Sequence, residues 1–181
     1  MQEVTLLPLA GTVVWLTGIS GAGKSTVGQL LARELRRDHA GVIYLDGDVL
    51  RHVFGEFAGH GNADRLRLAS SYGLLCLELA RQNSIVVCAT ISMFHEVRIW
   101  NRAHIERYFE VYLRVPLDEA MNRDPKGLYA RARRGEISEM VGLDRAMQEP
   151  DSPDLIVDNF GAMTAEATVE RIMVALGQKM G

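Results

Sequence analysis

A glycine-rich nonapeptide, Gly18 to Thr26 (Gly-Ile-Ser-Gly-Ala-Gly-Lys-Ser-Thr), directly follows an apolar, largely β-branched run at residues 13–17. It fits the pattern G-x-x-x-x-G-K-[ST], in which a strand turns sharply into a helix. Glycines let the backbone fold tightly so that successive N–H groups point at one anion, and the following helix adds the positive end of its dipole. Apolar residues at helical spacing follow, so a chance glycine turn is the weaker interpretation. The segment predicts a phosphate-binding loop.

In such a loop, each residue type has a physical task. Lys24 is expected to reach the β- and γ-phosphates of a nucleoside triphosphate, and Ser25 is expected to hold Mg²⁺ through its hydroxyl. The residues expected to bind the nucleotide are Gly18, Ser20, Gly21, Ala22, Gly23, Lys24, Ser25 and Thr26.

Short runs rich in β-branched or aromatic residues recur along the chain. After residues 13–17 they occupy residues 42–45, 85–90, 108–113 and 155–157. Helical patterns separate them, including apolar faces within residues 65–82 and 164–176. Strands that alternate with helices favour a parallel sheet covered on both faces. The expected fold class is therefore three-layer α/β with a five-stranded parallel sheet.

Composition limits the classes of protein that fit. The 181 residues are 48% hydrophobic, which suits one domain over residues 1–181. The net charge of −3 gives no global field for nucleic acid, so we expect no nucleic-acid partner. No signal peptide and no apolar run near the ~18 residues of a membrane span occurs, so we expect a cytoplasmic protein without a membrane partner. Cys76 and Cys88 lie in apolar runs and are expected to be buried thiols.

Polar residues follow the second and third predicted strands. Asp46, Asp48 and Arg51 come after one, and Ile91 and Ser92 come after the other. Because sites in open α/β sheets lie beyond the carboxyl ends of the strands, these residues are expected to face the γ-phosphate. One carboxylate can orient Mg²⁺ and another can take the proton of an attacking hydroxyl, while an arginine can bind an anionic acceptor. The alternative for the Asp-Gly-Asp string is a simple turn.

The stretch from residue 124 to residue 153 is dense in charge and glycine and contains no strong strand pattern. We predict that this lid segment closes over phosphates. Its cations are Lys126, Arg131, Arg133 and Arg134. The alternative is an ordinary solvated helix with charges paired at i,i+3 or i,i+4.

Several strings together resemble the adenylyl-sulfate kinase family. They are Gly18 to Thr26, Asp46 to Arg51 (Asp-Gly-Asp-Val-Leu-Arg), Asp64-Arg65, Ile91-Ser92, Arg123 to Tyr129 (Arg-Asp-Pro-Lys-Gly-Leu-Tyr), Gly135-Glu136-Ile137, Gly142-Leu143-Asp144, Glu149-Pro150 and Pro153-Asp154-Leu155. The resemblance implies a phosphate-loop kinase fold with a lid. It also implies an enzyme that uses ATP and Mg²⁺ to phosphorylate the ribose 3′-hydroxyl of adenosine 5′-phosphosulfate, a small-molecule nucleotide acceptor.

The resemblance also implies roles for individual residues. Asp48 is the candidate base and acts with Lys24 in catalysis, while Arg123 meets ATP. Asp46 is placed on the acceptor side, where it mainly serves the metal shell. The other residues expected on the acceptor side are Arg51, Arg65, Ile91, Ser92, Lys126 and Leu128.

The chain departs from the family pattern on the acceptor side. His60 and Met140 stand where two aromatic rings usually hold the adenine, and Leu68 replaces an asparagine. Phe54 or Phe57 could supply a ring instead. The segment from Ser92 to Arg102 is closer to a second branch of the family, which acts on cytidine diphosphoramidate in surface-polysaccharide biosynthesis.

Two other functions compete with catalysis. A non-catalytic nucleotide-binding domain would commonly lose Lys24 or Asp48, and both are present. A GTPase switch would need a guanine-reading Asn-Lys-x-Asp string, which does not occur. Association into a homodimer is left open.

Overall fold

The computed structural model describes residues 8–54, 61–137, 142–143 and 147–181. Its strands are β1 (Thr12–Thr17), β2 (Val42–Asp46), β3 (Ile85–Ala89), β4 (Arg107–Arg114) and β5 (Leu155–Asp158). Its helices are α1 (Lys24–Asp38), α2 (Gly47–Phe54), α3 (Asn62–Arg81), α4 (His95–His104), α5 (Leu117–Arg123), α6 (Leu128–Arg133) and α7 (Ala165–Met180).

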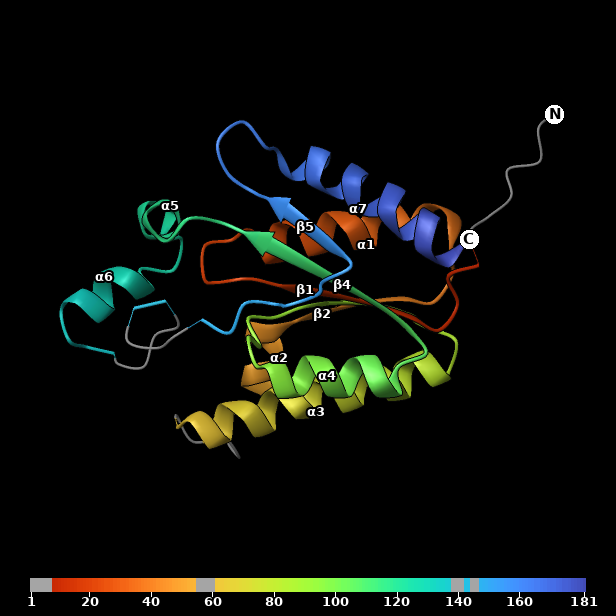
Figure 1. The fold of residues 1–181 in the computed structure, drawn as a ribbon, viewed down its shortest axis with the longest axis horizontal. Helices are drawn as coiled ribbons and strands as arrows, with labels where there is room; N and C mark the ends of the chain where they lie inside the picture. Colours follow the sequence, from red (N-terminus) through yellow and green to blue (C-terminus); the bar gives the residue numbers. More distant parts are fainter. Residues whose placement is uncertain (1–7, 55–60, 138–141, 144–146) are drawn as a thin grey trace.

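All five strands form one parallel sheet in the order β2-β3-β1-β4-β5. The central strand β1 pairs with β3 and β4, so that Val13 lies opposite Val86 on one side and Tyr108 on the other. Helices cover both faces, with α1 and α7 on one side and α2, α3 and α4 on the other (Figure 1). The predicted three-layer α/β fold with a five-stranded parallel sheet is confirmed.

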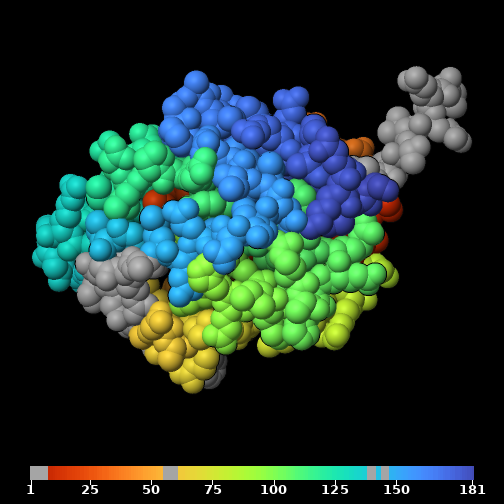
Figure 2. Space-filling view, in the orientation of Figure 1, coloured from red at the N-terminus to blue at the C-terminus, as the bar shows by residue number. Residues whose placement is uncertain are grey.

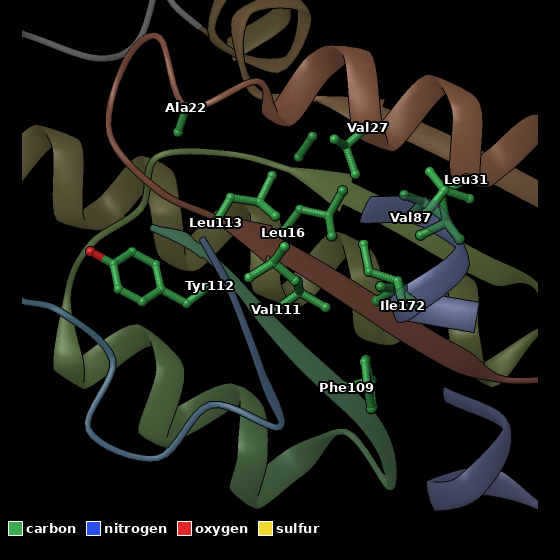
Figure 3. Packing of buried hydrophobic residues seen from close by; sticks show 14 of the residues in the cluster. Leu16, Ala22, Val27, Leu31, Val87, Phe109, Val111, Tyr112, Leu113 and Ile172 are labelled. Carbon is green, nitrogen blue, oxygen red and sulfur yellow. The ribbon is translucent and has the colours of Figure 1, made fainter. Parts of the chain in front are cut away.

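Alternate residues of β1 serve the two hydrophobic layers. Val14 and Leu16 pack towards α1 and α7, while Val13 and Trp15 pack towards α3 and α4, and all four are fully buried. In the first layer, side chains of the sheet lie against Val27, Leu31 and other residues of α1 (Figure 3). Burying a side chain of this size stabilises the fold by about 1.5–3 kcal/mol, so the central strand is a rigid base for the loop that follows it.

The two cysteines lie in the second layer. Cys76 comes from α3 and Cys88 from β3, and both are buried and free, as the sequence predicts.

The carboxyl ends of the strands point towards α5 and α6, which lie at the end of the molecule opposite the C-terminus (Figures 1 and 2). The Asp-Gly-Asp string after β2 is more than a simple turn, because α2 begins directly at Gly47. A Cβ at that position would lie 3.0 Å from the Thr90 hydroxyl and 3.1 Å from the Ala89 carbonyl, so any larger residue would require the end of β3 to shift by a few tenths of an ångström.

Candidate active site

A cavity of about 1410 Å³ lies at the carboxyl ends of β1, β2 and β3. It is lined by residues of the glycine-rich loop, the start of α2, α3, the segment after β3, and the region from residue 123 to residue 148. Most residues that the sequence predicts for the site meet here. They are Ser20, Gly21, Gly23, Lys24, Ser25, Thr26, Asp46, Asp48, Arg51, Arg65, Ile91, Ser92, Arg123, Lys126 and Leu128. Gly18 and Ala22 do not line the cavity and are buried instead.

The glycine-rich loop has the backbone that its sequence requires. Gly21 and Gly23 have φ angles of 79° and 83°, a region that residues with a Cβ rarely adopt. A Cβ on Gly21 would also lie 2.8 Å from the Ala120 carbonyl oxygen. Helix α1 begins at Lys24 with no acidic residue in its first turn, so the loop and the helix dipole together favour an anion.

Buried hydrogen bonds fix the loop to the end of β5. The Asn159 Nδ2 donates to the Ala22 carbonyl over 2.8 Å, and the Asn159 Oδ1 accepts from the Thr168 hydroxyl over 2.9 Å. Both Asn159 and Thr168 are buried. The loop is thus held in its anion-binding conformation by the core and not by the ligand alone.

Lys24 lies within the loop, where its Nζ donates to the Ile19 carbonyl over 2.7 Å. Its pKa is lowered from 10.5 to about 8, first by burial and then by the nearby charge of Lys126, against the opposing effect of Asp48 and Asp46. A partly desolvated ammonium attracts phosphate more strongly than one in bulk water, because the local dielectric constant is lower. Lys24 is therefore placed to bind the phosphates of a nucleotide.

Asp46 is the most firmly held carboxylate of the site. Its Oδ2 accepts from the Tyr44 hydroxyl over 2.7 Å, and its Oδ1 accepts from the Asp48 backbone N–H over 2.9 Å. Burial alone would raise its pKa, but hydrogen bonds from Ser25, Tyr44 and the Asp48 backbone hold the pKa below its ordinary value. The Ser25 hydroxyl and an ionised Asp46 thus meet as hard oxygen donors, which suit Mg²⁺.

Asp48 occupies the first turn of α2 and forms an ion pair with Lys126 of the lid segment. The two side chains are 63% and 48% exposed, so the pair is weak and open to exchange for other partners. Arg51 lies one turn further along α2 and also faces the cavity. The carboxylate predicted as the base is therefore accessible from the cavity.

The segment after β3 forms the opposite wall. Its backbone is fixed by the Thr17 hydroxyl, which donates to the Ile91 carbonyl over 2.6 Å, and by a 2.8 Å contact between the Thr90 and Ser92 hydroxyls. Ser92 has a φ of 24°, an uncommon value for a residue other than glycine. Ile91 and Ser92 thus face the same cavity as the phosphate loop.

Several cavity residues were not identified from the sequence. Leu68, where the family pattern has an asparagine, lines the cavity together with Tyr72, Phe94 and Gln148. Tyr72 belongs to an apolar helix face that is typical of the core, and Phe94 belongs to the Ser92–Arg102 segment, for which the sequence predicted no individual contact at that position. Phe54 does not line the cavity but packs on Tyr72, with 6.2 Å between the ring centroids. His60, Phe57 and Met140 lie outside the described residues.

Arg123, the last residue of α5, connects α5 to the residue that follows β5. Its Nη1 donates to the Asn159 carbonyl over 3.0 Å, and its Nε donates to Glu119 over 3.0 Å. Its Nη1 also lies 3.4 Å from the Gly21 carbonyl oxygen, so Arg123 lies beside the phosphate loop, and its contact with ATP stays a prediction.

The described part of the lid segment is docked on the loop by one buried side chain. Tyr129 is 1% exposed and donates its hydroxyl to the Ser20 carbonyl over 3.1 Å. The Asp124 carboxylate accepts the backbone N–H groups of Tyr129 and Ala130, which orders the start of α6.

The predicted group of lid cations is divided. Lys126 and Arg131 line the cavity, whereas Arg133 and Arg134 are not among the described residues that do. Arg131 and Arg134 both pair with Glu136 near the surface. These pairs are five and two residues apart and Glu136 lies beyond the end of α6, so they are local surface pairs and not the i,i+3 or i,i+4 helix pairs of the alternative.

A phosphate loop on a parallel sheet, with a carboxylate facing a cavity that extends well beyond the loop, defines the class of phosphate-loop kinases. The family described as adenylylsulphate kinase matches residues 10–158. A probable adenylyl-sulfate kinase of Bacillus subtilis is 39% identical over 171 residues, which cover 93% of this chain and 86% of that protein. The chain belongs to the adenylyl-sulfate kinase family, as its sequence motifs predict, and it is a kinase with an alcohol acceptor.

Two further relatives bear on the substrate. The cytidine diphosphoramidate kinase of Campylobacter jejuni is 37% identical over 164 residues, which cover 91% of this chain and 95% of that protein. The solved structure of the APS kinase of Mycobacterium tuberculosis in complex with AMPPNP and APS matches with a TM-score of 0.85 at 35% identity, covering 93% of this chain and 99% of the other. Within the described part of the chain, no helix is both long and apolar enough to cross a membrane.

Proposed function

We propose that this enzyme transfers the γ-phosphoryl group of ATP to the ribose 3′-hydroxyl of adenylyl sulfate and yields 3′-phosphoadenylyl sulfate. The observation that carries the proposal is one continuous cavity that contains both the phosphate loop and Asp48. The similarity to adenylyl-sulfate kinases along most of the chain, and to a structure solved with a nucleotide analogue and APS, supports this acceptor.

The donor side binds and neutralises phosphate. Loop N–H groups and Lys24 bind the β- and γ-phosphates, and Arg123 contacts the nucleotide from the side. Ser25 and Asp46 would hold Mg²⁺, which when bound offsets negative charge on the transferring group. Tyr44 keeps the Asp46 carboxylate aimed at Ser25 through its hydrogen bond.

The acceptor side provides the base and the anion contacts. Asp48 accepts the proton of the 3′-hydroxyl, because it is the carboxylate that faces the cavity without the hydrogen bonds that hold Asp46. Arg51 and Arg65 contact the acceptor nucleotide, together with Ile91 and Ser92 of the opposite wall.

The lid segment completes the site in this proposal. Lys126 leaves Asp48 when the acceptor binds and contacts the acceptor with Leu128, which frees the base at the moment it is needed. Residues 1–181 act as one kinase domain, with the lid at about 124–153.

A cytidine acceptor is the second candidate, favoured by the similarity to the Campylobacter jejuni enzyme over 95% of that protein. Leu68 is 5% exposed and presents an apolar surface to the cavity, so it cannot hydrogen-bond a base as an asparagine would. The loss of such a contact affects which base binds but leaves the phosphoryl-transfer groups untouched.

A coupled assay of ADP release, run with adenylyl sulfate and with cytidine diphosphoramidate side by side, tests the proposal. Turnover with adenylyl sulfate at the higher kcat/KM is expected. A higher kcat/KM with cytidine diphosphoramidate replaces the first acceptor with the second. ADP release with neither acceptor, under conditions in which ATP binds, contradicts both.

A homodimer belongs to the same proposal. Light scattering during size-exclusion chromatography measures the mass of the particle directly. A mass near twice the 20.1 kDa of one chain supports association, and a mass near 20.1 kDa contradicts it.

A further inference from the structure

The last residues of the lid segment and the residue after them, 147–154, lead to β5 and are called the return segment. At Gln148 this segment reaches the rim of the cavity. Gln148 lines the cavity, and its Oε1 accepts the His95 backbone N–H at the start of α4 over 2.8 Å. This part of the acceptor wall thus depends on how the return segment is attached to α4.

A buried arginine makes that attachment. Arg98 of α4 is 5% exposed, and its Nη2 donates to the carbonyl oxygens of Gln148 over 2.8 Å and Glu149 over 3.2 Å. The partner residues are 50 and 51 positions away in sequence. One guanidinium therefore connects the second layer of helices to the backbone of the return segment.

A buried carboxylate on β4, that of Glu110, balances the charge of Arg98. The Arg98 Nε lies 3.4 Å from Oε1 of Glu110, a side chain that is 3% exposed. Burial lowers the pKa of Arg98 and raises the pKa of Glu110, and their mutual attraction opposes both effects. A buried ion pair of this kind contributes little net stability compared with apolar side chains of similar volume. The buried charge therefore serves mainly to place Arg98 Nη2 where it donates to the two backbone carbonyls of the return segment.

A second arginine secures the far end of the segment. Arg102 donates to the other Glu110 oxygen over 3.0 Å, to the Ser152 carbonyl over 3.1 Å and to the Asp154 carboxylate. Asp154 in turn accepts the Glu110 backbone N–H over 2.7 Å. The two arginines together fasten the return segment from residue 148 to residue 154, and Arg98 is the one at the cavity end.

We propose that Arg98 is a positioning residue for acceptor binding. It holds the backbone at Gln148 and Glu149 so that Gln148 forms part of the acceptor wall and the lid moves about a fixed C-terminal end. The proposal deepens the proposed function and rests on its assignment of this wall to the acceptor. Arg98 does not line the cavity, so its effect passes through the return segment and through His95, whose Nδ1 lies 2.9 Å from Arg98 Nη2.

Two variants separate this role from general stability. Arg98→Lys keeps the charge but has a single terminal nitrogen, which cannot replace both Nη2, the atom that contacts the two carbonyls, and Nε, the atom beside Glu110. The double variant Arg98→Met/Glu110→Leu removes both buried charges and the carbonyl contacts together, which avoids an unpaired buried carboxylate. Arg114→Met is the control, since Arg114 makes its hydrogen bonds and ion pair with Asp158 at the surface, and Glu149 of the return segment acts on it only through its charge.

Hydrogen exchange and kinetics give two readouts. In the ligand-free protein, exchange at the His95 amide, whose N–H donates to Gln148 Oε1, is expected to accelerate by about tenfold in the double variant and less in Arg98→Lys, because the return segment that carries the acceptor oxygen is loosened. The KM for the acceptor is expected to rise by about tenfold in the double variant, while the KM for ATP changes less than about twofold. The Arg114→Met control is expected to match the parent in both readouts.

An acceptor KM at the parent value in both Arg98 variants overturns the proposal, whatever the exchange rates show. Equal increases in the KM for ATP and for the acceptor also overturn it, because a general loosening of the fold would produce them. Failure of the proposed function is distinguishable: the parent would then not use adenylyl sulfate, while the exchange measurement, which needs no substrate, would still report whether Arg98 fastens the segment.

Discussion

The phosphate loop and the lid segment line the same cavity but are held in place by different means. The loop is fixed by buried contacts, such as that of Asn159 with the Ala22 carbonyl. Residues 124–137 of the lid have one buried anchor, Tyr129, and otherwise surface contacts such as the ion pair of Lys126 with Asp48. Surface pairs of this kind contribute only about 0–1 kcal/mol. The donor half is therefore rigid before ligands bind, whereas in the acceptor half residues 124–137 are free to rearrange around them.

The largest expected effect follows from removing the central cation of the rigid half. Lys24→Ala is expected to lower phosphoryl transfer by at least about 10³, because Lys24 is the loop cation placed to neutralise the transferring group. ADP release measures the loss, and circular dichroism checks that the fold is intact. Turnover near the parent rate in a folded variant would break the assignment of the donor half.

The next effect tests the contact between the two halves. Asp48→Asn is expected to lower kcat by about 10²–10⁴, the usual range for an acid–base group, with little change in ATP binding. Asp46→Asn provides the comparison, since it should raise the Mg²⁺ concentration required for half-maximal rate. An unchanged kcat in Asp48→Asn would remove this carboxylate from the chemistry.

A smaller effect is expected from pH. Because the pKa of Lys24 is lowered to about 8, it loses its charge above that pH, and the affinity for ADP should fall by up to about tenfold between pH 8 and 9.5. The effect on stability has the opposite sign. Between about 8 and 10.5 the unfolded chain holds the Lys24 proton more tightly, so this group's contribution to the free energy of unfolding rises with pH.

Isothermal titration with ADP at several pH values measures the change in affinity. Asp48→Asn is the companion variant, because removing a nearby negative charge should lower the pH at which affinity is lost. An affinity that stays constant from pH 7 to 9.5 would contradict the lowered pKa of Lys24.

The smallest effect sharpens the comparison directly. Hydrogen exchange at residues 124–137 is expected to slow severalfold when ADP and acceptor are added, because a lid held by weak pairs orders on binding. The strand at residues 12–17 is the internal control and should exchange slowly with or without ligands. Equal protection of residues 124–137 with and without ligands would show a static helix. The lid would then be as rigid as the phosphate loop.

The sequence predicts the donor half well because local physics determines it. Glycines at residues 21 and 23 are required by their own φ angles, and alternating apolar residues place β1 in the centre of the sheet. The Asp-Gly-Asp string leaves a functional motif and a simple turn as alternatives, and the helix that begins at Gly47 was not predicted, since an Asp-Gly dipeptide alone does not indicate it.

The acceptor half could be predicted only in part because its contacts join distant segments. Lys126 meets Asp48 across 78 residues, and Arg98 meets Gln148 across 50. No spacing rule connects such pairs, and an arginine in a charged helix reads as a surface residue until its burial is known. Arg133 and Arg134 show the converse, because clustering in sequence does not bring them to the cavity with Lys126.

The order of the strands also has a consequence for how the chain reaches its native state. β1 begins at residue 12, yet the residues that pair with its Val13 are Val86 and Tyr108. A parallel strand cannot be completed by a local hairpin, so a chain emerging from the ribosome must present β1 for more than 70 residues before β3 arrives. Contacts of such long sequence separation slow folding. Among the strands, β1 is therefore the one that remains without a paired strand for the longest stretch of synthesis. This apolar strand, which later forms the base of the phosphate loop, must be protected from association with other chains during that time.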